Sequence, residues 1–246
     1  GIRRIDKSPI LESVVHQIRI QKDFRYLDKQ KLSNEADLQG VDYIYYPLHV
    51  EPETSLGMLA PEFNEQFAVI QLLAKNLPAG VKLAVKEHVY AVGRRPRGFY
   101  RALQEIPNVI LTSPVANSLE LVKQSRCVAV FTSTAGFEAS AMGTPVVSFG
   151  LHNIYNFLPH VYVVKSWLEL RKTLKFVLDE ENQDAMLQRK KDGNRLLEAV
   201  RRAGFDLSGV DYAATQSRRK RKQATQEEAN FFFSTLMDSL DVSQKN

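Results

Sequence analysis

Short apolar runs alternate with helix-like segments through the middle of this sequence. Apolar runs of this length, bounded by turn residues, are typical of buried strands. We predict six strands, at Tyr43–Leu48, Val81–Val85, Val109–Leu111, Val128–Phe131, Val146–Phe149 and Val161–Val164. Helix-favouring segments separate them, at Pro61–Asn76, Arg97–Ile106, Asn117–Ser125 and Ala135–Met142. Because strands that alternate with helices form parallel sheets, the pattern predicts an α/β fold with a Rossmann-like, doubly wound parallel sheet of about six strands.

Helical patterns flank this region on both sides. Residues 10–39 have helical spacing without a strand signal, and three more helices are expected at Ser166–Leu178, Gln183–Arg202 and Thr225–Leu240. We therefore predict three parts: a helical lead-in or linker over residues 1–40, a Rossmann-like domain over 41–180, and a C-terminal helical extension with a basic segment over 181–246. The chain begins with Gly rather than Met, so we expect a processed chain or a piece cut from a longer one.

The stretch Val128–Gly150 carries the strongest chemical signal. It predicts a buried strand, a turn of small residues at Thr132–Gly136, a short helix and a second strand. Small side chains leave the backbone N–H groups at a helix start free to bind an anion. Glu138, within the first turns of that helix, could accept hydrogen bonds from a sugar diol. The pattern fits a nucleotide or nucleotide-sugar site, or else a tightly packed crossover with Glu138 as a solvated acid.

Further polar residues follow the predicted strands and would share one edge of the sheet, where ligands of such folds bind. His49, His88 and His152 all follow strands. Lys86 and His88 alternate on a strand end, so both would point the same way, and an ammonium beside an imidazole donor suits a phosphate oxygen. The alternative is a surface lysine beside a hydrogen-bonded histidine.

Charged residues in the loops after the strands are further candidates. Arg94 and Arg95, with His49, could contact an anionic ligand, although a pair of loop arginines is often simply solvated. Glu51 and Glu53 lie two residues apart just after the first strand, and either could be a general base or orient a sugar hydroxyl.

The composition narrows the class of protein. The chain has 246 residues, of which 44% are hydrophobic and 25% charged, and a formal net charge of +5. This is ordinary for a globular protein, and no apolar run is long enough for a membrane span. The single cysteine, Cys127, lies in an apolar run and is expected in the core rather than as a nucleophile. The basic run Arg218–Lys222 could attract anionic lipid, or it could be a solvated face or flexible joint.

Several familiar motifs are missing from the sequence. It contains no G-x-x-x-x-G-K-[ST] loop, no G-x-G-x-x-G and no G-x-S-x-G, which argues against a common ATPase, dehydrogenase or serine hydrolase. There is no Asp-x-Asp and no zinc-ligand spacing, so we expect no metal and no cofactor. The basic run lacks interleaved aromatic residues, so we expect no nucleic acid as a partner. After these exclusions, the kind of site that remains is a phosphate site built from backbone N–H groups, Lys and His.

Four segments resemble a known family in their order along the chain. YYPLHVEPE, VKEHVYAVGRRPRGFYRAL, PNVILTSP and TSTAGFEASAMGTPVVSFG extend from about Tyr43 to Val164. They are similar to bacterial capsule and surface-polysaccharide biosynthesis glycosyltransferases, which include Kdo transferases that use CMP-Kdo. The Gly-x-Glu-Ala pattern alone is shared with nucleotide-sugar epimerases, whereas Lys-Glu-His followed by Gly-Arg-Arg-Pro is narrower. The family often has Pro directly after this histidine, where this chain has Val89.

The resemblance implies a site and an activity. It implies the donor-binding half of a GT-B fold, with residues 41–180 as the nucleotide-sugar-binding domain. Lys86 and His88 would contact the donor phosphate, which Ser133, Thr134 and Gly136 would cradle at the helix start. Glu138 would bind the ribose hydroxyls, and Glu51 or Glu53 would lie near the sugar as the catalytic carboxylate. The enzyme would transfer a sugar, with Kdo from CMP-Kdo as one candidate, to a growing capsule or surface polysaccharide or its lipid-linked acceptor.

A GT-B enzyme also needs an N-terminal acceptor domain, and only about 40 residues precede the first predicted strand. We expect that domain in a longer chain. The expected location is the cytoplasm, with contact to the inner face of the membrane through Arg218–Lys222. A non-catalytic scaffold that binds nucleotide sugars or glycans, and an epimerase, are the alternatives. The identity of the sugar, nucleotide and acceptor, the stereochemical course and the oligomeric state stay open.

Overall fold

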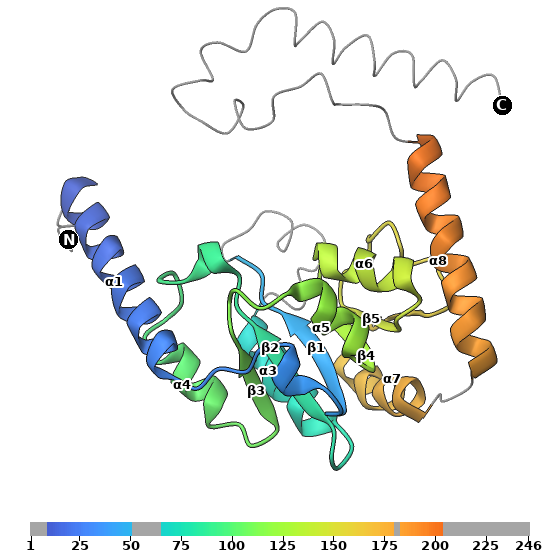
Figure 1. Cartoon of the computed structure of the whole chain (residues 1–246), viewed down its shortest axis with the longest axis horizontal. Helices are drawn as coiled ribbons and strands as arrows, with labels where there is room; N and C mark the ends of the chain where they lie inside the picture. Colours follow the sequence, from blue (N-terminus) through green and yellow to red (C-terminus); the bar gives the residue numbers. More distant parts are fainter. Residues whose placement is uncertain (1–8, 51–64, 180–182, 204–246) are drawn as a thin grey trace, which may run out of the picture. The chain divides into compact units, whose positions relative to one another are not determined.

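The computed structural model describes residues 9–50, 65–179 and 183–203 (Figure 1). The contacts divide the chain into two compact units, Gly1–Gly193 and Asn194–Asn246. Several sequence predictions lie outside the described residues: the helix start at Pro61, the helix Thr225–Leu240, the basic run Arg218–Lys222, and the carboxylates Glu51 and Glu53.

Six parallel strands form the central sheet, as predicted. They are β1 (Tyr43–Pro47), β2 (Lys82–Lys86), β3 (Val109–Thr112), β4 (Cys127–Val130), β5 (Val146–Ser148) and β6 (Val161–Val163), in the order β3-β2-β1-β4-β5-β6. This is the doubly wound Rossmann-like order, which reverses direction between β1 and β4. The polar edge after Pro47 and Lys86, which are register partners, therefore lies beside that reversal.

Helices cover both faces of the sheet. The helices of the described residues are α1 (Pro9–Lys29), α3 (Gln66–Asn76), α4 (Phe99–Gln104), α5 (Ser118–Gln124), α6 (Thr134–Met142), α7 (Trp167–Asp179) and α8 (Gln183–Ala203), with single 3-10 turns η1 (Ala36–Leu38) and η3 (Val89–Ala91). Helices α3, α4 and α7 share the main core on one face of the sheet, and α5 lies at the other face. Helix α3 packs beside α7, and α5 packs beside α6. No helix of the described part of the chain is both long and apolar enough to cross a membrane.

The buried strands alternate between these two helical layers. Ile44 and Tyr46 belong to the main apolar core, together with residues of α3, α4 and α7. Tyr43 and Tyr45 point to the other face, where the Tyr43 hydroxyl donates to the carbonyl of Leu121 in α5 at 2.8 Å. Because both faces are covered, the strands have no polar alternation, which is why they read as continuous apolar runs. Cys127 is fully buried in β4, as expected of a core residue.

Most predicted helix bounds agree with the structure to within a few residues. The helical pattern over residues 10–39 is the main exception, because α1 ends at Lys29 and only the single turn η1 follows it before β1. Helix α4 begins at Phe99, two residues after the predicted start at Arg97. Gly98 has a φ of +81°, in the left-handed region, so the helix cannot extend back through it. The next helix, α5, begins on a side-chain cap: Asn117 Oδ1 accepts the N–H groups of Leu119 and Glu120.

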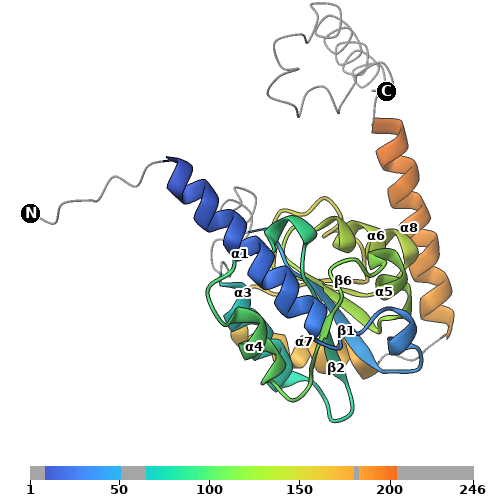
Figure 2. The same cartoon turned by 60° about the vertical axis from the view of Figure 1, so that its left-hand side comes forward.

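The lead-in helix α1 lies beside α4 in both views (Figure 1 and Figure 2). The Tyr26 hydroxyl donates to Gln104 of α4 at 2.8 Å. After α1, Ser33 forms an isolated parallel bridge with Thr112 at the end of β3. Residues before the first strand are therefore joined to the Rossmann-like domain within the first compact unit.

We predict that Gly136→Ala in α6 destabilises the protein. An added Cβ would lie 2.8 Å from Val130 Cγ2 and would also collide with the Tyr155 hydroxyl. Overpacking of this kind costs about 1–3 kcal/mol of unfolding free energy, measurable by urea denaturation. Without the collision, Gly→Ala in a helix would stabilise by about 1 kcal/mol, so an increase in stability would contradict the packing described here. Adding Tyr155→Phe should recover part of the loss.

Candidate functional site

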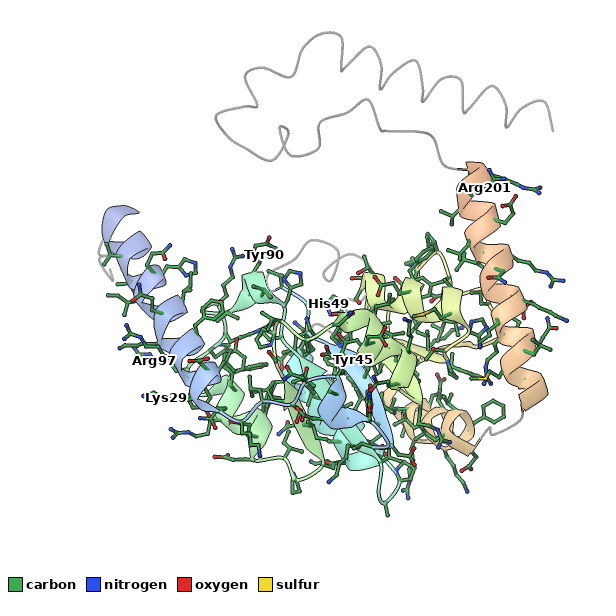
Figure 3. The ribbon with its side chains drawn as sticks, in the orientation of Figure 1. Lys29, Tyr45, His49, Tyr90, Arg97 and Arg201 are labelled. Carbon is green, nitrogen blue, oxygen red and sulfur yellow. The ribbon has the colours of Figure 1, made fainter. Side chains whose placement is uncertain are left out.

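A cleft of about 640 Å³ opens at the carboxyl ends of β1, β2 and β4. This volume is in the range of small-molecule sites, and the place is the strand reversal where Rossmann-like folds bind ligands. The cleft is lined by residues that follow the three strands and by the starts of α5 and α6: Tyr45, Pro47–Val50, Lys86–Tyr90, Ser118, Thr132–Ala135 and Glu138. Figure 3 shows His49 and Tyr90 near the same edge of the sheet, with Tyr45 further back along β1.

His49 joins the two strands that diverge at this point. Its Nε2 accepts the backbone N–H of Thr132, after β4, at 3.2 Å. Its own backbone is clamped by Gln66 of α3, whose Oε1 accepts the His49 N–H at 2.6 Å and whose Nε2 donates to the His49 carbonyl at 3.1 Å. The imidazole packs edge-on against Phe131, with ring centroids 5.6 Å apart. His49 therefore fixes the position of the turn that precedes α6.

The surroundings keep His49 uncharged. Burial lowers its pKa to about 4; the charges of Arg95 and His88 act in the same direction and a hydrogen bond with Gln66 acts against them. Because Nε2 accepts a hydrogen bond, the proton of the neutral ring lies on Nδ1. This differs from the expectation of an anion contact through His49, since the ring offers the cleft neither a charge nor an Nε2–H.

Lys86 and His88 both line the cleft from the end of β2. Partial burial lowers the pKa of Lys86, while the neighbouring Glu87 raises it. The Nδ1 atom of His88 accepts the N–H of Tyr90 at 3.3 Å, which caps η3. The neutral His88 ring therefore carries its proton on Nε2, as a hydrogen-bond donor. An ammonium and an imidazole N–H thus lie two residues apart at one rim of the cleft.

The two arginines expected nearby have different environments. Arg94 is exposed, and the described lining of the cleft does not include it. The Arg95 side chain is only 2% exposed and forms an ion pair with Glu87, Nε to Oε2, at 2.8 Å. Arg95 was expected to contact an anionic ligand, but the structure commits its guanidinium to a buried carboxylate. Sequence spacing could not show this, because the pairing depends on how the loop after β2 turns back.

The start of α6 closes the opposite side of the cleft. Ser133 is its N-cap, with Oγ accepting the Ala135 N–H at 3.0 Å, and Thr134 is the first helical residue. Gly136 was expected in the anion cradle, but it is buried against Tyr155 and Val130, and its N–H donates to the Ser133 carbonyl at 3.0 Å. Gly136 is therefore needed for close packing, and the exposed rim consists of Ser133 and Thr134.

Glu138 lines the cleft one turn further along α6. Burial raises the pKa of its carboxyl group. Beside it lies Tyr45, whose hydroxyl bonds the Ser118 side chain and whose pKa is raised mainly by burial and further by Glu138. Sequence reasoning did not select Tyr45, Ser118 or Tyr90. The alternation along β1 places Tyr45 on the face of α5 and α6, and this was the signal that could have identified it.

Among the described residues, no group of three or more His, Cys, Asp or Glu side chains is placed to hold a metal ion. The lining instead has two chemically distinct ends. Lys86 and the His88 N–H lie at the end of β2. The Glu138 carboxyl group lies on α6, and the hydroxyls of Tyr45 and Ser118 line the cleft beside it. Such a cleft suits a ligand with an anionic group at one end and hydrogen-bond donors at the other.

The fold and the cleft define a Rossmann-like α/β domain with a polar cleft at the strand reversal. The profile of the family described as capsule polysaccharide biosynthesis protein matches residues 11–158, more than half of the chain. The chain belongs to this family. The match begins within α1, so it includes the lead-in helix as well as the segments from Tyr43 onward.

Comparison with curated proteins gives no match. Among solved structures, the β-Kdo 2,7 transferase of Thermosulfurimonas dismutans KpsC is 19% identical with a TM-score of 0.39, over 64% of this chain and 51% of that one. Its β-Kdo 2,4 transferase is 16% identical with a TM-score of 0.42, over 70% and 55%. The UDP-GlcNAc 2-epimerase of Methanocaldococcus jannaschii is 14% identical with a TM-score of 0.48, over 77% and 54%. This chain thus spans about half the length of these structures.

The environment of His49 predicts a pH dependence of stability. Its pKa is lowered from 6.5 to about 4 in the folded protein, so between these values the unfolded chain binds more protons and stability falls as the pH falls. The contribution amounts to about 3 kcal/mol of unfolding free energy. Urea denaturation at pH 7, 5.5 and 4.5 should show a shallower dependence for His49→Gln, which can accept the Thr132 N–H but does not titrate. Equal slopes for the two proteins would refute this account.

Proposed function

We propose that this chain is the donor-binding part of a glycosyltransferase that builds a capsule or surface polysaccharide. The observation that carries the proposal is the grouping of Lys86, His88, the start of α6 and Glu138 around one cleft at the strand reversal. Family membership supports a role in capsule polysaccharide biosynthesis.

The proposed donor is a nucleotide-activated sugar, with CMP-Kdo as the leading candidate. In this proposal the ammonium of Lys86 and the Nε2–H of His88 bind the phosphate, together with the rim at Ser133 and Thr134. Glu138 accepts hydrogen bonds from the ribose hydroxyls at the other end. The similar solved structures include Kdo transferases and a UDP-GlcNAc 2-epimerase, so several nucleotides should be tested.

The proposed chemistry is stabilisation of the leaving phosphate. As the bond from the sugar to the phosphate breaks, negative charge grows on the nucleotide, and preorganised donors at that point lower the barrier. The cation of Lys86 and the donor of His88 can act in this way without a metal ion. The carboxylate that would assist the acceptor, proposed as Glu51 or Glu53, lies outside the described residues, or it comes from an acceptor domain in a longer chain.

The proposed acceptor is a growing glycan or its lipid-linked precursor at the inner face of the membrane. The basic run Arg218–Lys222 is proposed to contact that surface. An assay of the full-length gene product separates transfer from the alternatives. A transferase forms product only when an acceptor is added, whereas an epimerase converts free UDP-sugar without one. A scaffold binds the donor and does neither.

We predict that the chain binds CMP in preference to CDP, UDP and GDP in calorimetric titrations. Lys86→Ala and His88→Ala should weaken CMP binding roughly 10- to 100-fold, because each removes a hydrogen bond to a charged group. Glu138→Ala should also weaken it, through the ribose. Preference for UDP or GDP would retain the site and exclude CMP-Kdo as the donor.

Lys82→Ala is the matched control for Lys86→Ala. Lys82 is the first residue of β2 and lies at the opposite edge of the sheet, as the register partner of Tyr43. Its removal changes the net charge by the same amount without touching the cleft, so nucleotide affinity should stay within about twofold. An equal loss in both variants would mean that general charge, and not this cleft, governs binding.

A further inference from the structure

Beneath the cleft, Glu87 and Arg95 form a two-point ion pair. Arg95 Nε donates to Glu87 Oε2 at 2.8 Å, and Nη2 donates to Oε1 at 2.9 Å. The Arg95 side chain is 2% exposed and the Glu87 side chain 0%. A buried pair of this kind often adds little net stability, since the desolvation of both charges offsets their attraction. Its other contacts indicate what it does.

Both partners also bind the backbone of a cleft histidine. Glu87 Oε1 accepts the N–H of His88 at 2.6 Å, and Arg95 Nη2 donates to the carbonyl of His49 at 2.6 Å. His88 follows β2 and His49 follows β1, so the pair ties the ends of two neighbouring strands together. Through the hydrogen bond from the Thr132 N–H to His49 Nε2, the connection extends to the end of β4.

Helix α4 supports the pair from below. The Tyr100 hydroxyl donates to Glu87 Oε2 at 3.0 Å, and the guanidinium of Arg95 lies over the Phe99 ring, 5.3 Å from its centroid. The Glu87 carboxylate thus accepts four hydrogen bonds, from His88, Tyr100 and two nitrogens of Arg95. A carboxylate–guanidinium pair that is held by this many hydrogen bonds is fixed in one geometry.

We propose that Glu87 and Arg95 are positioning residues, which set the place of both cleft histidines and the tautomer of His49 for phosphate binding. This rests on the proposed function for the phosphate itself. Arg95 then acts through His49 rather than on the ligand. In the sequence Lys86-Glu87-His88, the first and third residues face the cleft, and Glu87 holds them in place through its hydrogen bonds to His88 and Arg95.

The charge of Arg95 also bears on His49. The charged or polar groups that face this ring are Arg95, His88 and Gln66, and burial together with Arg95 and His88 lowers its pKa. A neutral ring can accept the Thr132 N–H, whereas a protonated ring cannot. Loss of Arg95 would therefore both free the backbone of His49 and make the ring easier to protonate.

The test is the double variant Glu87→Gln/Arg95→Met, which removes both charges together and leaves no unpaired ion. Histidine ring signals in ¹H–¹⁵N NMR spectra report the tautomer without any ligand. In the unaltered protein His49 should show a protonated Nδ1 and remain neutral down to about pH 5. In the double variant we expect mixed tautomers, a titration midpoint of His49 that moves upward, and CMP affinity reduced at least tenfold. Arg101→Ala, an exposed arginine on α4, should change none of these.

Arg95→Lys separates charge from geometry. Lysine keeps the positive charge but lacks the planar fork that reaches Glu87 and the His49 carbonyl together. We expect His49 to stay neutral, its ring signals to shift toward mixed tautomers because the hydrogen bond to its carbonyl is lost, and CMP affinity to fall. If the double variant does not fold, Arg95→Lys and Tyr100→Phe decide the question. In Tyr100→Phe, only one of the four hydrogen bonds to Glu87 is lost, so a smaller change in the His49 and His88 signals is expected.

A folded double variant with the original His49 tautomer and titration would overturn the proposal, as would unchanged ring signals in both single variants. The NMR measurement is independent of nucleotide. If no nucleotide binds the unaltered protein, the proposed donor site fails, while the ring signals still show whether Glu87 and Arg95 position the histidines.

Discussion

The pairing of β1 with β4 is the constraint on which the site depends. Only two register pairs join these strands, Ile44 with Cys127 and Tyr45 with Val128, and beyond them the chain leaves toward different neighbours. A crevice at this point is a geometric consequence of the strand order. The hydrogen bond from the Thr132 N–H to His49 spans that crevice at its base. This contact holds the turn before α6 against the end of β1, and it needs a neutral imidazole as its acceptor.

Much of the fold could be predicted from the sequence, because strands buried on both faces appear as apolar runs and all six were found. The position of the polar rim followed from strand order alone. What the pattern could not give was the partner of each rim residue. Arg95 was predicted either to contact an anionic ligand or to be solvated, but it pairs with Glu87, which it reaches only because the loop after β2 folds back. Gly136 was read as a phosphate-binding glycine, whereas its neighbour Tyr155 comes from a distant loop. Tertiary contacts, and not local propensity, decide these cases.

The electrostatics of the cleft are balanced rather than strongly positive. Among the described residues, its lining has the ammonium of Lys86 at one end and the carboxyl group of Glu138 at the other, while Glu87 and Arg95 neutralise each other in a buried ion pair. A site of this kind distinguishes ligands by where their charge lies more than by how much they carry. Because positive and negative groups balance in the cleft, the net charge of +5 for the whole chain does not predict the charge of the ligand that the cleft suits.

The buried thiol of Cys127 can report how often the central sheet opens. It is the chain's one thiol, it is fully buried in β4 beside the strand reversal, and burial raises its pKa to about 12. A thiol-specific reagent can therefore react only when the centre of the sheet separates. The labelling rate under native conditions measures how often that happens, at the very strand on which the crevice is built. A bound ligand that holds β1 and β4 together would lower the labelling rate of Cys127. Ligand binding can therefore be measured without an enzymatic assay.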